Sequence, residues 1–362
     1  MSAHRVVGTL CWTCVVATAM FFSVAAIPAA PQDSGYKVIR TIHLGGEGGW
    51  DYVTVDSQAR RVYIPRGTHI MVVDEGTGMV IADIPDLKGL HGVAVAPEFN
   101  RGFATGNQSR DEGTIYVFDL KTLKITSSLK STGIDTDSLI YDPGSKRVFV
   151  NNGDGMNTTV VDAATAQIAG TVALEGGPEA AVSDGKGNVF VNIADKAQML
   201  EYDAKTLAIK QRWPTAPCQR PVGLSMDTAH RRLFMACQGA ATLLVVMNAD
   251  NGKVVSMQPI GIGADGSAYD AATNTVFVTC RDGGDGKNGA TLVFHEDSPD
   301  KYTQVAKVPT IYGARTIALD PKTHHMFSIG TEQNDPVSPT AQNPNPRPRP
   351  VPSTFELLEI GK

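Results

Sequence analysis

The feature that most constrains the fold is a segment pattern that occurs seven times along the chain. In each copy a short strand of alternating apolar and polar residues ends at a turn, and an aromatic residue follows in the next strand. This aromatic residue lies seven positions after the end of the first strand in six copies and six positions after it in the fourth. The aromatic positions are Tyr63, Phe103, Phe149, Phe190, Phe234, Phe277 and Phe327, which gives a period of 40 to 50 residues. Self-similarity at such a period is typical of repeat architectures, including β-propellers.

Each copy has the pattern of four short antiparallel strands. In the first copy, Gly49 to Ile84, alternating apolar residues are separated by Gly, Asp, Ser and Thr clusters, which is typical of a β-meander. Its inner strand is expected at Tyr52–Asp56. The third strands end at Asp74, Asp119, Asp162, Asp203, Asn248, His295 and Glu359. Since one such sheet cannot bury both faces alone, its neighbours must be further copies.

The seventh copy lacks a fourth strand after Glu359, and Tyr36–Leu44 supplies an unassigned strand before the first copy. Pairing the two closes a ring and leaves no open sheet edge. The alternative is an open solenoid, which needs polar terminal repeats. The terminal copies are not polar, and Ile42 and Leu44 would be left unpaired. We therefore predict an all-β, seven-bladed β-propeller with four-stranded blades, closed by the N-terminal strand.

Three segments also carry a family resemblance. YVTV at Tyr52–Val55, RVYIP at Arg61–Pro65 and RVFVNN at Arg147–Asn152, with the VVD–turn–V pattern, resemble the YVTN-type, YncE-like seven-bladed β-propellers. The resemblance extends over essentially all of residues 31–362. It implies the propeller fold and an exported or surface protein, and it assigns no catalytic residue.

Residues 1–30 have the composition of a signal peptide. Arg5 provides a positive start, Val6 to Ala26 is apolar, and small residues follow. We predict a signal peptide at 1–30, a single propeller domain at 31–362, and an exported protein that is periplasmic or extracellular, with no transmembrane segment after cleavage. A membrane anchor is the alternative, because the apolar run is near spanning length.

The charge balance disfavours nucleic acid as a partner. The formal net charge is −5, whereas affinity for a phosphate backbone needs patches of Lys and Arg. A group of basic residues, predicted to lie on the face of the ring opposite the channel mouth, keeps this alternative open. It consists of Arg60, Arg61, Lys146, Arg147, His230, Arg231 and Arg232. Solvated turn residues explain the same group more simply.

One position differs from copy to copy, five residues before the end of the first strand. Because the inner strands of a propeller begin on one face, these side chains should meet at the mouth of the central channel. The predicted ligand-binding residues are Asp51, His91, Asp137, Glu179, Arg220, Asp265 and Arg315, where Arg220 replaces the apolar Val222. The set has two interpretations, either a water-filled channel with compensating arginines or a ligand or metal site.

Carboxylates held close together cannot all ionise at low cost, so either their pKa values rise or a cation lies among them. Oxygen ligands suit Ca²⁺, and the addition of His91 suits Zn²⁺. In the metal interpretation the ligands are Asp137, Glu179 and Asp265, and His91 or Asp51 is the candidate catalytic base. The binding interpretation requires no cofactor.

Two further features belong to the same face. A Pro-rich loop, Glu332–Ser353, is inserted in the last blade, where it forms a flap, a docking segment or a passive insertion. Three cysteines follow the signal segment. Cys218 and Cys237 fall within one blade and form the expected disulfide, which leaves Cys280 unpaired.

These observations favour a non-enzymatic binding or scaffold protein that presents the acidic channel mouth to a small ligand, a glycan or a protein. The alternative is a metal-dependent hydrolase that resembles propeller lactonases, with a divalent ion at the channel mouth.

Overall fold

The computed structural model describes residues 1, 2, 4, 34–334, 340 and 349–362. The chain divides into two units, Met1–Gln32 and Asp33–Lys362. Nearly all of the predicted signal peptide, and residues 335–339 and 341–348 of the Pro-rich loop, lie outside the described residues. In the described part the helices are two three-residue 3₁₀ turns, Pro97–Phe99 and Ala194–Lys196, and neither has the length to cross a membrane.

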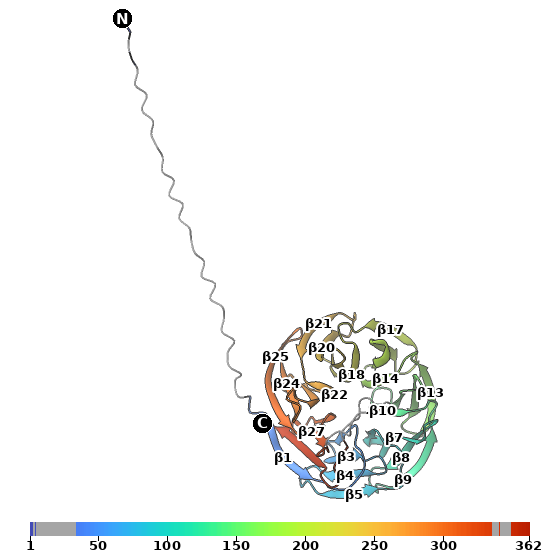
Figure 1. Ribbon diagram of the computed structural model, residues 1–362. Helices are drawn as coiled ribbons and strands as arrows, with labels where there is room; N and C mark the ends of the chain where they lie inside the picture. The colour runs from blue at the N-terminus through green and yellow to red at the C-terminus, as the bar shows by residue number, and fades with distance from the viewer. Residues whose placement is uncertain (3, 5–33, 335–339, 341–348) are drawn as a thin grey trace. The chain divides into compact units, whose positions relative to one another are not determined.

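Residues 37–361 form seven four-stranded antiparallel sheets arranged around a central axis, as predicted (Figure 1). We number these blades in chain order. Blades 1 to 3 are β2 (Thr54–Asp56), β3 (Arg61–Pro65), β4 (Ile70–Asp74) and β5 (Val80–Ile84); β6 (Val93–Ala96), β7 (Arg101–Ser109), β8 (Glu112–Asp119) and β9 (Ile125–Lys130); and β10 (Thr136–Asp142), β11 (Arg147–Asn152), β12 (Asn157–Asp162) and β13 (Gln167–Ala173). Blades 4 and 5 are β14 (Pro178–Ser183), β15 (Asn188–Ile193), β16 (Gln198–Asp203) and β17 (Ile209–Pro214); and β18 (Arg220–Asp227), β19 (Arg232–Gln238), β20 (Leu243–Asn248) and β21 (Val254–Pro259). Blades 6 and 7 are β22 (Ile262–Asp270), β23 (Thr275–Asp282), β24 (Gly289–Ser298) and β25 (Lys301–Thr310); and β26 (Ile317–Asp320), β27 (His325–Gly330), β28 (Glu356–Gly361) and β1 (Lys37–His43).

The ring is closed by β1, which is the outer strand of blade 7. It pairs antiparallel with β28, from Lys37 opposite Gly361 to His43 opposite Glu356. The prediction of closure by the N-terminal strand is therefore confirmed, and the open solenoid is wrong. Three strand boundaries differ from expectation by one or two residues. The closing strand is shorter at both ends than Tyr36–Leu44, and the innermost strand of blade 1 begins at Thr54 rather than Tyr52.

The acidic residue that ends most of the first strands has a local structural role. In blade 1, Asp56 Oδ1 accepts hydrogen bonds from the N–H groups of Gln58 and Ala59, both at 3.0 Å. The turn then ends at Arg60, whose φ is 57°, before β3 begins. Asp and Asn side chains favour such turns because they bond to the backbone two or three residues on. The repeated acidic residue is thus explained by turn chemistry.

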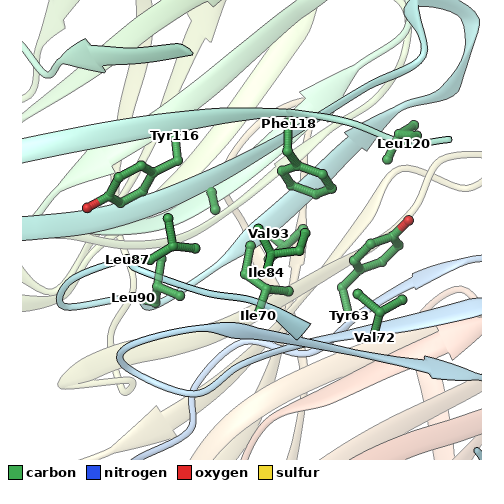
Figure 2. Close-up of a cluster of buried hydrophobic side chains, with 11 residues drawn as sticks. Tyr63, Ile70, Val72, Ile84, Leu87, Leu90, Val93, Tyr116, Phe118 and Leu120 are labelled. Atoms are coloured by element: carbon green, nitrogen blue, oxygen red, sulfur yellow. The ribbon is translucent and has the colours of Figure 1, made fainter. Parts of the chain in front are cut away.

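The repeated aromatic residues fill the layers between neighbouring blades. Between blades 1 and 2, Tyr63 lies 5.8 Å from Phe118, measured between ring centroids, and Leu87 and Val93 pack against the same cluster (Figure 2). Tyr63 and Phe118 are fully buried. Because each blade buries one face against each neighbour, stability depends on every blade having two partners.

Basic residues at the turns opposite the predicted channel mouth join one blade to the next. The Arg61 guanidinium donates to the Leu120 carbonyl oxygen at 2.5 Å, and Arg147 donates to the Ala204 carbonyl oxygen at 2.8 Å. Arg232 similarly donates to the Pro299 carbonyl oxygen at 3.0 Å. Several members of the basic group that kept nucleic-acid binding open are therefore engaged in contacts between blades.

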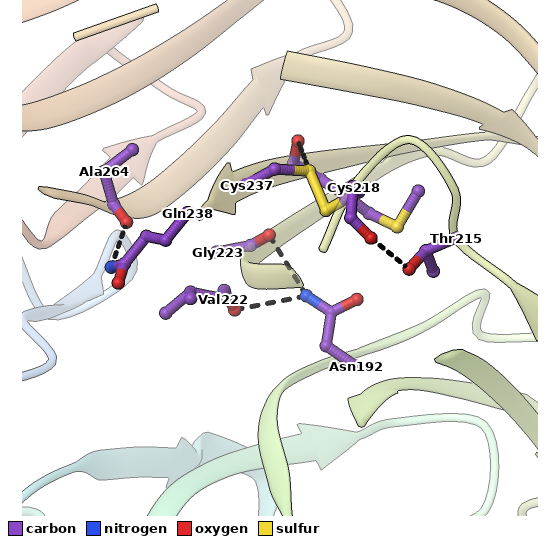
Figure 3. Close-up of a disulfide and its surroundings, with 9 residues drawn as sticks. Asn192, Thr215, Cys218, Val222, Gly223, Cys237, Gln238 and Ala264 are labelled. Carbon is purple, nitrogen blue, oxygen red and sulfur yellow. Dashed lines mark hydrogen bonds between the residues drawn. A yellow bond between two sulfur atoms is a disulfide. The ribbon is translucent and has the colours of Figure 1, made fainter. Parts of the chain in front are cut away.

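Within blade 5 the structure contains a disulfide between Cys218 and Cys237, with the sulfur atoms 2.06 Å apart (Figure 3). Cys237 lies on β19, and Cys218 lies just before β18, where its carbonyl oxygen accepts a hydrogen bond from Thr215 Oγ1 at 2.9 Å. Cys280 is buried and forms no disulfide with any cysteine among the described residues. This arrangement corresponds to the pairing expected within one blade.

Candidate functional site

The variable residues lie at or just before the start of the innermost strands, so seven blades each place one position on the same face of the ring. Their backbone is fixed by side chains from the preceding blade. Thr105 Oγ1 donates to the Asp137 carbonyl oxygen at 2.6 Å, and Asn151 Nδ2 donates to the Glu179 carbonyl oxygen at 2.8 Å. The ring of variable residues is therefore held by hydrogen bonds that run from blade to blade.

These tethering side chains were missed from the sequence, although a regular signal exists. In four copies a Thr or Asn follows the second-strand aromatic residue by two positions, namely Thr105, Asn151, Asn192 and Thr279. A short polar side chain that is repeated inside a buried strand needs a hydrogen-bond partner, and here the partner is the carbonyl of the next blade.

Three variable residues from blades 1, 2 and 3 meet in one cluster. His91 Nδ1 lies 2.9 Å from Asp51 Oδ2 and 3.5 Å from Asp137 Oδ1. One ligand atom from each of the three residues lies within 4.8 Å of the other two. The Tyr52 hydroxyl is 3.5 Å from the other oxygen of Asp137. We call Asp51, His91 and Asp137 the mouth cluster.

The other charged variable residues form two ion pairs between neighbouring blades. Arg220 Nη2 lies 2.8 Å from Glu179 Oε1, and Arg315 Nε lies 2.9 Å from Asp265 Oδ2. The Arg315 guanidinium also lies 5.8 Å from the centre of the Trp50 ring. This placement agrees with the expectation that blade 5 contributes Arg220, in place of Val222, to the ring of charged residues.

The candidate metal ligands that the structure brings together differ from the set expected from the sequence. Asp137, Glu179 and Asp265 do not come together at ligand distance in the part of the chain that the structure describes, whereas Asp51, His91 and Asp137 do. Side chains of neighbouring blades are close enough to interact, and Glu179 and Asp265 form ion pairs with Arg220 and Arg315 of the neighbouring blades instead.

Three acidic side chains of the channel mouth hold protons more tightly than free carboxyl groups do. Burial raises the pKa of Asp137 well above its usual range, and the negative charge of Asp51 adds to the shift. Burial raises the pKa of Asp265 to about 7, although Arg315 opposes it, and burial likewise raises the pKa of Glu179. Burial lowers the pKa of His91, but its hydrogen bond to Asp51 and the charge of Asp137 outweigh this and leave the pKa raised. Four carboxylates face two guanidinium groups and one imidazole, so protons or another cation balance the mouth.

Tyr52 is the main residue of the site that the sequence did not indicate. Burial raises the pKa of its hydroxyl well above the usual range, and Asp137, Asp51, Glu179 and Asp265 add to the shift. The hydroxyl is therefore a neutral donor directed at the acidic side chains. The alternating pattern places Tyr52 within the first strand, and an aromatic residue in a strand is most simply explained as part of the hydrophobic core.

We expect the protein to be more stable at pH 5.5 than at pH 8. Asp137, Glu179 and Asp265 have raised pKa values in the folded state, so the folded protein binds more protons than the unfolded chain above pH 4. Their stabilising contribution is complete below the unfolded pKa of about 4 and is lost as pH rises through the folded value, and each excess proton contributes about 1.4 kcal/mol per pH unit. The raised pKa of His91 acts in the same direction, with its contribution lost above about pH 6.5.

Urea denaturation at pH 5.5, 6.5, 7.5 and 8.5 measures this dependence. The matched variant is Asp265→Asn, which should show a smaller decrease in the free energy of unfolding over the same range. A wild-type free energy of unfolding that stays constant or increases from pH 5.5 to 8.5 would contradict the assigned protonation states.

The base of the Pro-rich loop is described on both sides of the gap. The Val351 N–H donates to the Glu332 carbonyl oxygen, and the Ser353 N–H donates to the Gly46 carbonyl oxygen, both at 2.8 Å. Gln333 and Pro350 form an isolated antiparallel bridge. The loop therefore leaves and re-enters the fold at one place, beside the segment that precedes blade 1, and its role as a flap or docking segment stays a prediction.

The fold and the ring of variable residues define a seven-bladed β-propeller. No protein-family model matches the chain. Among curated proteins, it is similar to the uncharacterized protein YncE of Salmonella typhi, with 26% identity over 176 residues, which is 48% of this chain and 37% of that protein. The chain thus matches little more than a third of the length of this relative. Together with the seven-bladed fold, this match confirms the predicted resemblance to YncE-like propellers.

Solved structures with the same architecture are more distant in sequence. A chain from "Crystal Structure of Mitotic Checkpoint Complex" matches with a TM-score of 0.69 and 12% identity, over 87% of this chain and 95% of that one. The WD40 repeats of RRP9 match with a TM-score of 0.69 and 7% identity, over 89% and 97%. A chain of Kuenenia stuttgartiensis hydrazine synthase matches with a TM-score of 0.65 and 14% identity, over 79% and 94%. At these identities the likeness concerns the fold alone.

Proposed function

We propose that the protein is an exported binding propeller whose channel mouth captures a positively charged ligand, with a divalent cation as the simplest occupant. The observation that carries the proposal is the mouth cluster, in which Asp51, His91 and Asp137 from three blades present ligand atoms within 4.8 Å of one another. Carboxylate and imidazole ligands together suit Zn²⁺ or Mn²⁺.

The protonation state of the site supports this proposal. The raised pKa of Asp137 means that protons now relieve the repulsion among the carboxylates. A cation that enters the cluster relieves the same repulsion and releases those protons, since metal ligands must be deprotonated. Binding should therefore be stronger at pH 7.5 than at pH 5.5.

Access and rigidity support it as well. The side chains of His91 and Asp137 are 34% and 19% exposed, so the cluster is open to solvent but largely shielded. The Thr105 hydroxyl fixes the backbone at Asp137, and the Thr316 hydroxyl donates to the Asp51 carbonyl oxygen at 2.8 Å. A site that is already ordered loses little conformational entropy when it binds.

Export is part of the proposal. Residues 1–30 have the signal-peptide pattern, and a disulfide joins Cys218 and Cys237, as is common in oxidising compartments. In that setting the open face can present its site to a small molecule, a glycan or a protein. The Pro-rich loop, whose described base follows β27, is the natural second contact for a larger ligand.

A metal-dependent hydrolase is the second candidate function, and the one-histidine, two-carboxylate composition of the mouth cluster favours it. Such a ligand set leaves coordination positions for water, and a bound divalent ion would supply a water of lowered pKa. Asp51 and His91 would then be ligands rather than the base expected from sequence. The Tyr52 hydroxyl, 3.5 Å from Asp137, would orient the carboxylate.

Isothermal titration with Zn²⁺, Mn²⁺ and Ca²⁺ tests the proposal on residues 34–362. Wild type should bind a cation at the mouth, and Asp137→Asn should weaken that binding at least tenfold because it removes a charged ligand. Asp265→Asn is the matched control, since Asp265 is paired with Arg315 outside the cluster, and it should bind as wild type does. Equal binding by wild type and Asp137→Asn would refute the mouth cluster as the site.

Hydrolysis assays separate the two functions. With saturating Zn²⁺, p-nitrophenyl acetate and a simple γ-lactone should be turned over only if the site is catalytic. Turnover that Asp137→Asn abolishes and Asp265→Asn retains would favour the hydrolase. Cation binding without turnover supports the binding protein.

A further inference from the structure

We propose a second divalent-cation site, with Zn²⁺ as the expected ion, between blades 5 and 6 on the face opposite the channel mouth, formed by Asp227, His230 and Glu296. One ligand atom from each residue lies within 4.8 Å of the other two. Asp227 ends β18 and His230 lies in the turn that follows, whereas Glu296 lies on β24 of the neighbouring blade. A bound ion would therefore connect two blades.

The first argument is an unsatisfied buried oxygen. The Glu296 side chain is 3% exposed, and its Oε1 accepts no hydrogen bond from any residue that the structure describes, although it faces the cluster. Its other oxygen accepts a hydrogen bond from the Tyr269 hydroxyl at 2.7 Å. The nearest basic atom to Oε1 is His230 Nδ1 at 3.5 Å, which already lies 2.6 Å from Asp227 Oδ2. A buried carboxylate oxygen without a partner is costly, and a cation satisfies it.

The second argument comes from the internal repeat. In each blade, the position equivalent to Glu296 is the residue directly after the end of the third-strand repeat. In blades 1 and 6, the N–H of this residue donates to the carbonyl oxygen of the last residue of the turn between the first and second strands. Only blades 1 and 6 have a carboxylate there, Glu75 and Glu296, and the other blades have Leu120, Ala163, Ala204, Ala249 and Ile360. The N–H of Glu75 donates to the Arg60 oxygen at 2.9 Å, and that of Glu296 donates to the Asn274 oxygen at 2.8 Å.

These two blades differ in the residue that neutralises the buried carboxylate. In blade 1 the Arg60 guanidinium lies 3.3 Å from Glu75 and 3.7 Å from Asp320 of the preceding blade, so a permanent cation bridges the two carboxylates. In blade 6 the position of Arg60 is taken by the neutral Asn274. Two carboxylates, Asp227 and Glu296, face each other there with a single imidazole between them. A divalent cation supplies the charge that Arg60 supplies in blade 1.

The chemistry of the ligands selects the ion. An imidazole with two carboxylates suits Zn²⁺ better than Ca²⁺, which prefers six or more oxygen ligands. Zn–N and Zn–O bonds of about 2.0–2.2 Å place neighbouring ligands about 3.3 Å apart, so the His230 ring must move slightly away from Asp227. The His230 ring has room to move because its side chain is 50% exposed, and an ion can enter the site from solvent on this side. Arg232, the nearest guanidinium, is paired with Asp300 at 2.8 Å.

Native mass spectrometry and isothermal titration with ZnCl₂ on residues 34–362 test the site. Wild type should bind Zn²⁺ at this site in addition to any ion held at the channel mouth. Glu296→Gln should reduce the Zn²⁺ count by one per chain, and His230→Gln should do the same with little effect on folding, because His230 is half-exposed. Glu75→Gln is the matched control at the equivalent position, and it should leave the count unchanged.

The mouth variant keeps this test independent of the proposed function. Asp137→Asn should lose the ion at the channel mouth and keep the ion at Asp227, His230 and Glu296, whereas Glu296→Gln should show the reverse. If the wild-type stoichiometry is unchanged by both Glu296→Gln and His230→Gln, the second site is refuted, whatever happens at the mouth. If the Zn²⁺ that these variants lose is also lost in Glu75→Gln, the binding is nonspecific and the proposal is equally refuted.

Discussion

Deletion of residues 1–44, which removes β1, should lower the free energy of unfolding by roughly 5 kcal/mol or more and broaden the unfolding transition. The deletion removes a ladder of six paired positions along β28, and each backbone hydrogen bond contributes about 1 kcal/mol net. It also removes Ile42 and Leu44, which pack against the core of blades 7 and 1, and Tyr36, whose ring lies 5.3 Å from that of Phe277. Domains are commonly stable by only roughly 5–15 kcal/mol, so the loss is a large fraction of the total.

Deletion of residues 1–33 is the matched control, because it leaves the whole of β1 in place. Thermal and urea denaturation followed by circular dichroism should show wild-type behaviour for this control. The shorter protein should also self-associate, since β28 becomes an exposed edge strand. Equal stability of the two deletion variants would show that closure by β1 is dispensable.

Loss of the disulfide is the second large expected effect. Replacing both Cys218 and Cys237 with Ala should lower the free energy of unfolding by about 3 kcal/mol, since the two cysteines are 19 residues apart and a cross-link over such a loop restricts the unfolded chain by about that amount. Alanine is chosen because both side chains are fully buried and a hydroxyl there would lack a partner.

The disulfide prediction has two controls. Cys280→Ala should cost only about 1 kcal/mol, as expected for removal of one small buried group. Dithiothreitol should destabilise wild type and Cys280→Ala by similar amounts, and it should leave the Cys218→Ala, Cys237→Ala protein unchanged. A wild-type unfolding curve that is insensitive to reductant would contradict a stabilising disulfide.

The sequence was sufficient for the architecture because a propeller repeats its local rules. The alternating strands, the capping aspartates such as Asp56 and the buried aromatic residues such as Tyr63 each recur once per blade, so seven weak local signals add up to one fold. Strand ends were less predictable. Tyr52 continues the alternation of the first strand, yet β2 begins only at Thr54, because the Tyr52 N–H donates to the His91 carbonyl oxygen of blade 2 at 2.9 Å rather than to β3.

The site was predictable in position and only partly in detail. Topology alone places Asp51, His91 and Asp137 on one face, because it depends only on where each inner strand begins. The partners depend on side-chain length and on the distance between blades, so the pairing of Glu179 with Arg220 and of Asp265 with Arg315 needed coordinates. The repeat aligns Glu296 with Glu75 in the sequence, but only the folded blades show that both side chains are buried.

The closing strand also sets the order in which the protein becomes complete. The ion pair from Arg40 on β1 to Glu359 on β28 joins residues 319 positions apart, so β1 must wait for almost the whole of the propeller to be synthesised before it finds its partner. The hydrogen bond from Thr316 to Asp51 joins blade 7 to blade 1, over 265 positions. The support of the mouth cluster at Asp51 thus forms only when the ring closes. We therefore expect an unfinished or wrongly closed chain to lack this support, which would couple the proposed ligand capture to the completion of folding.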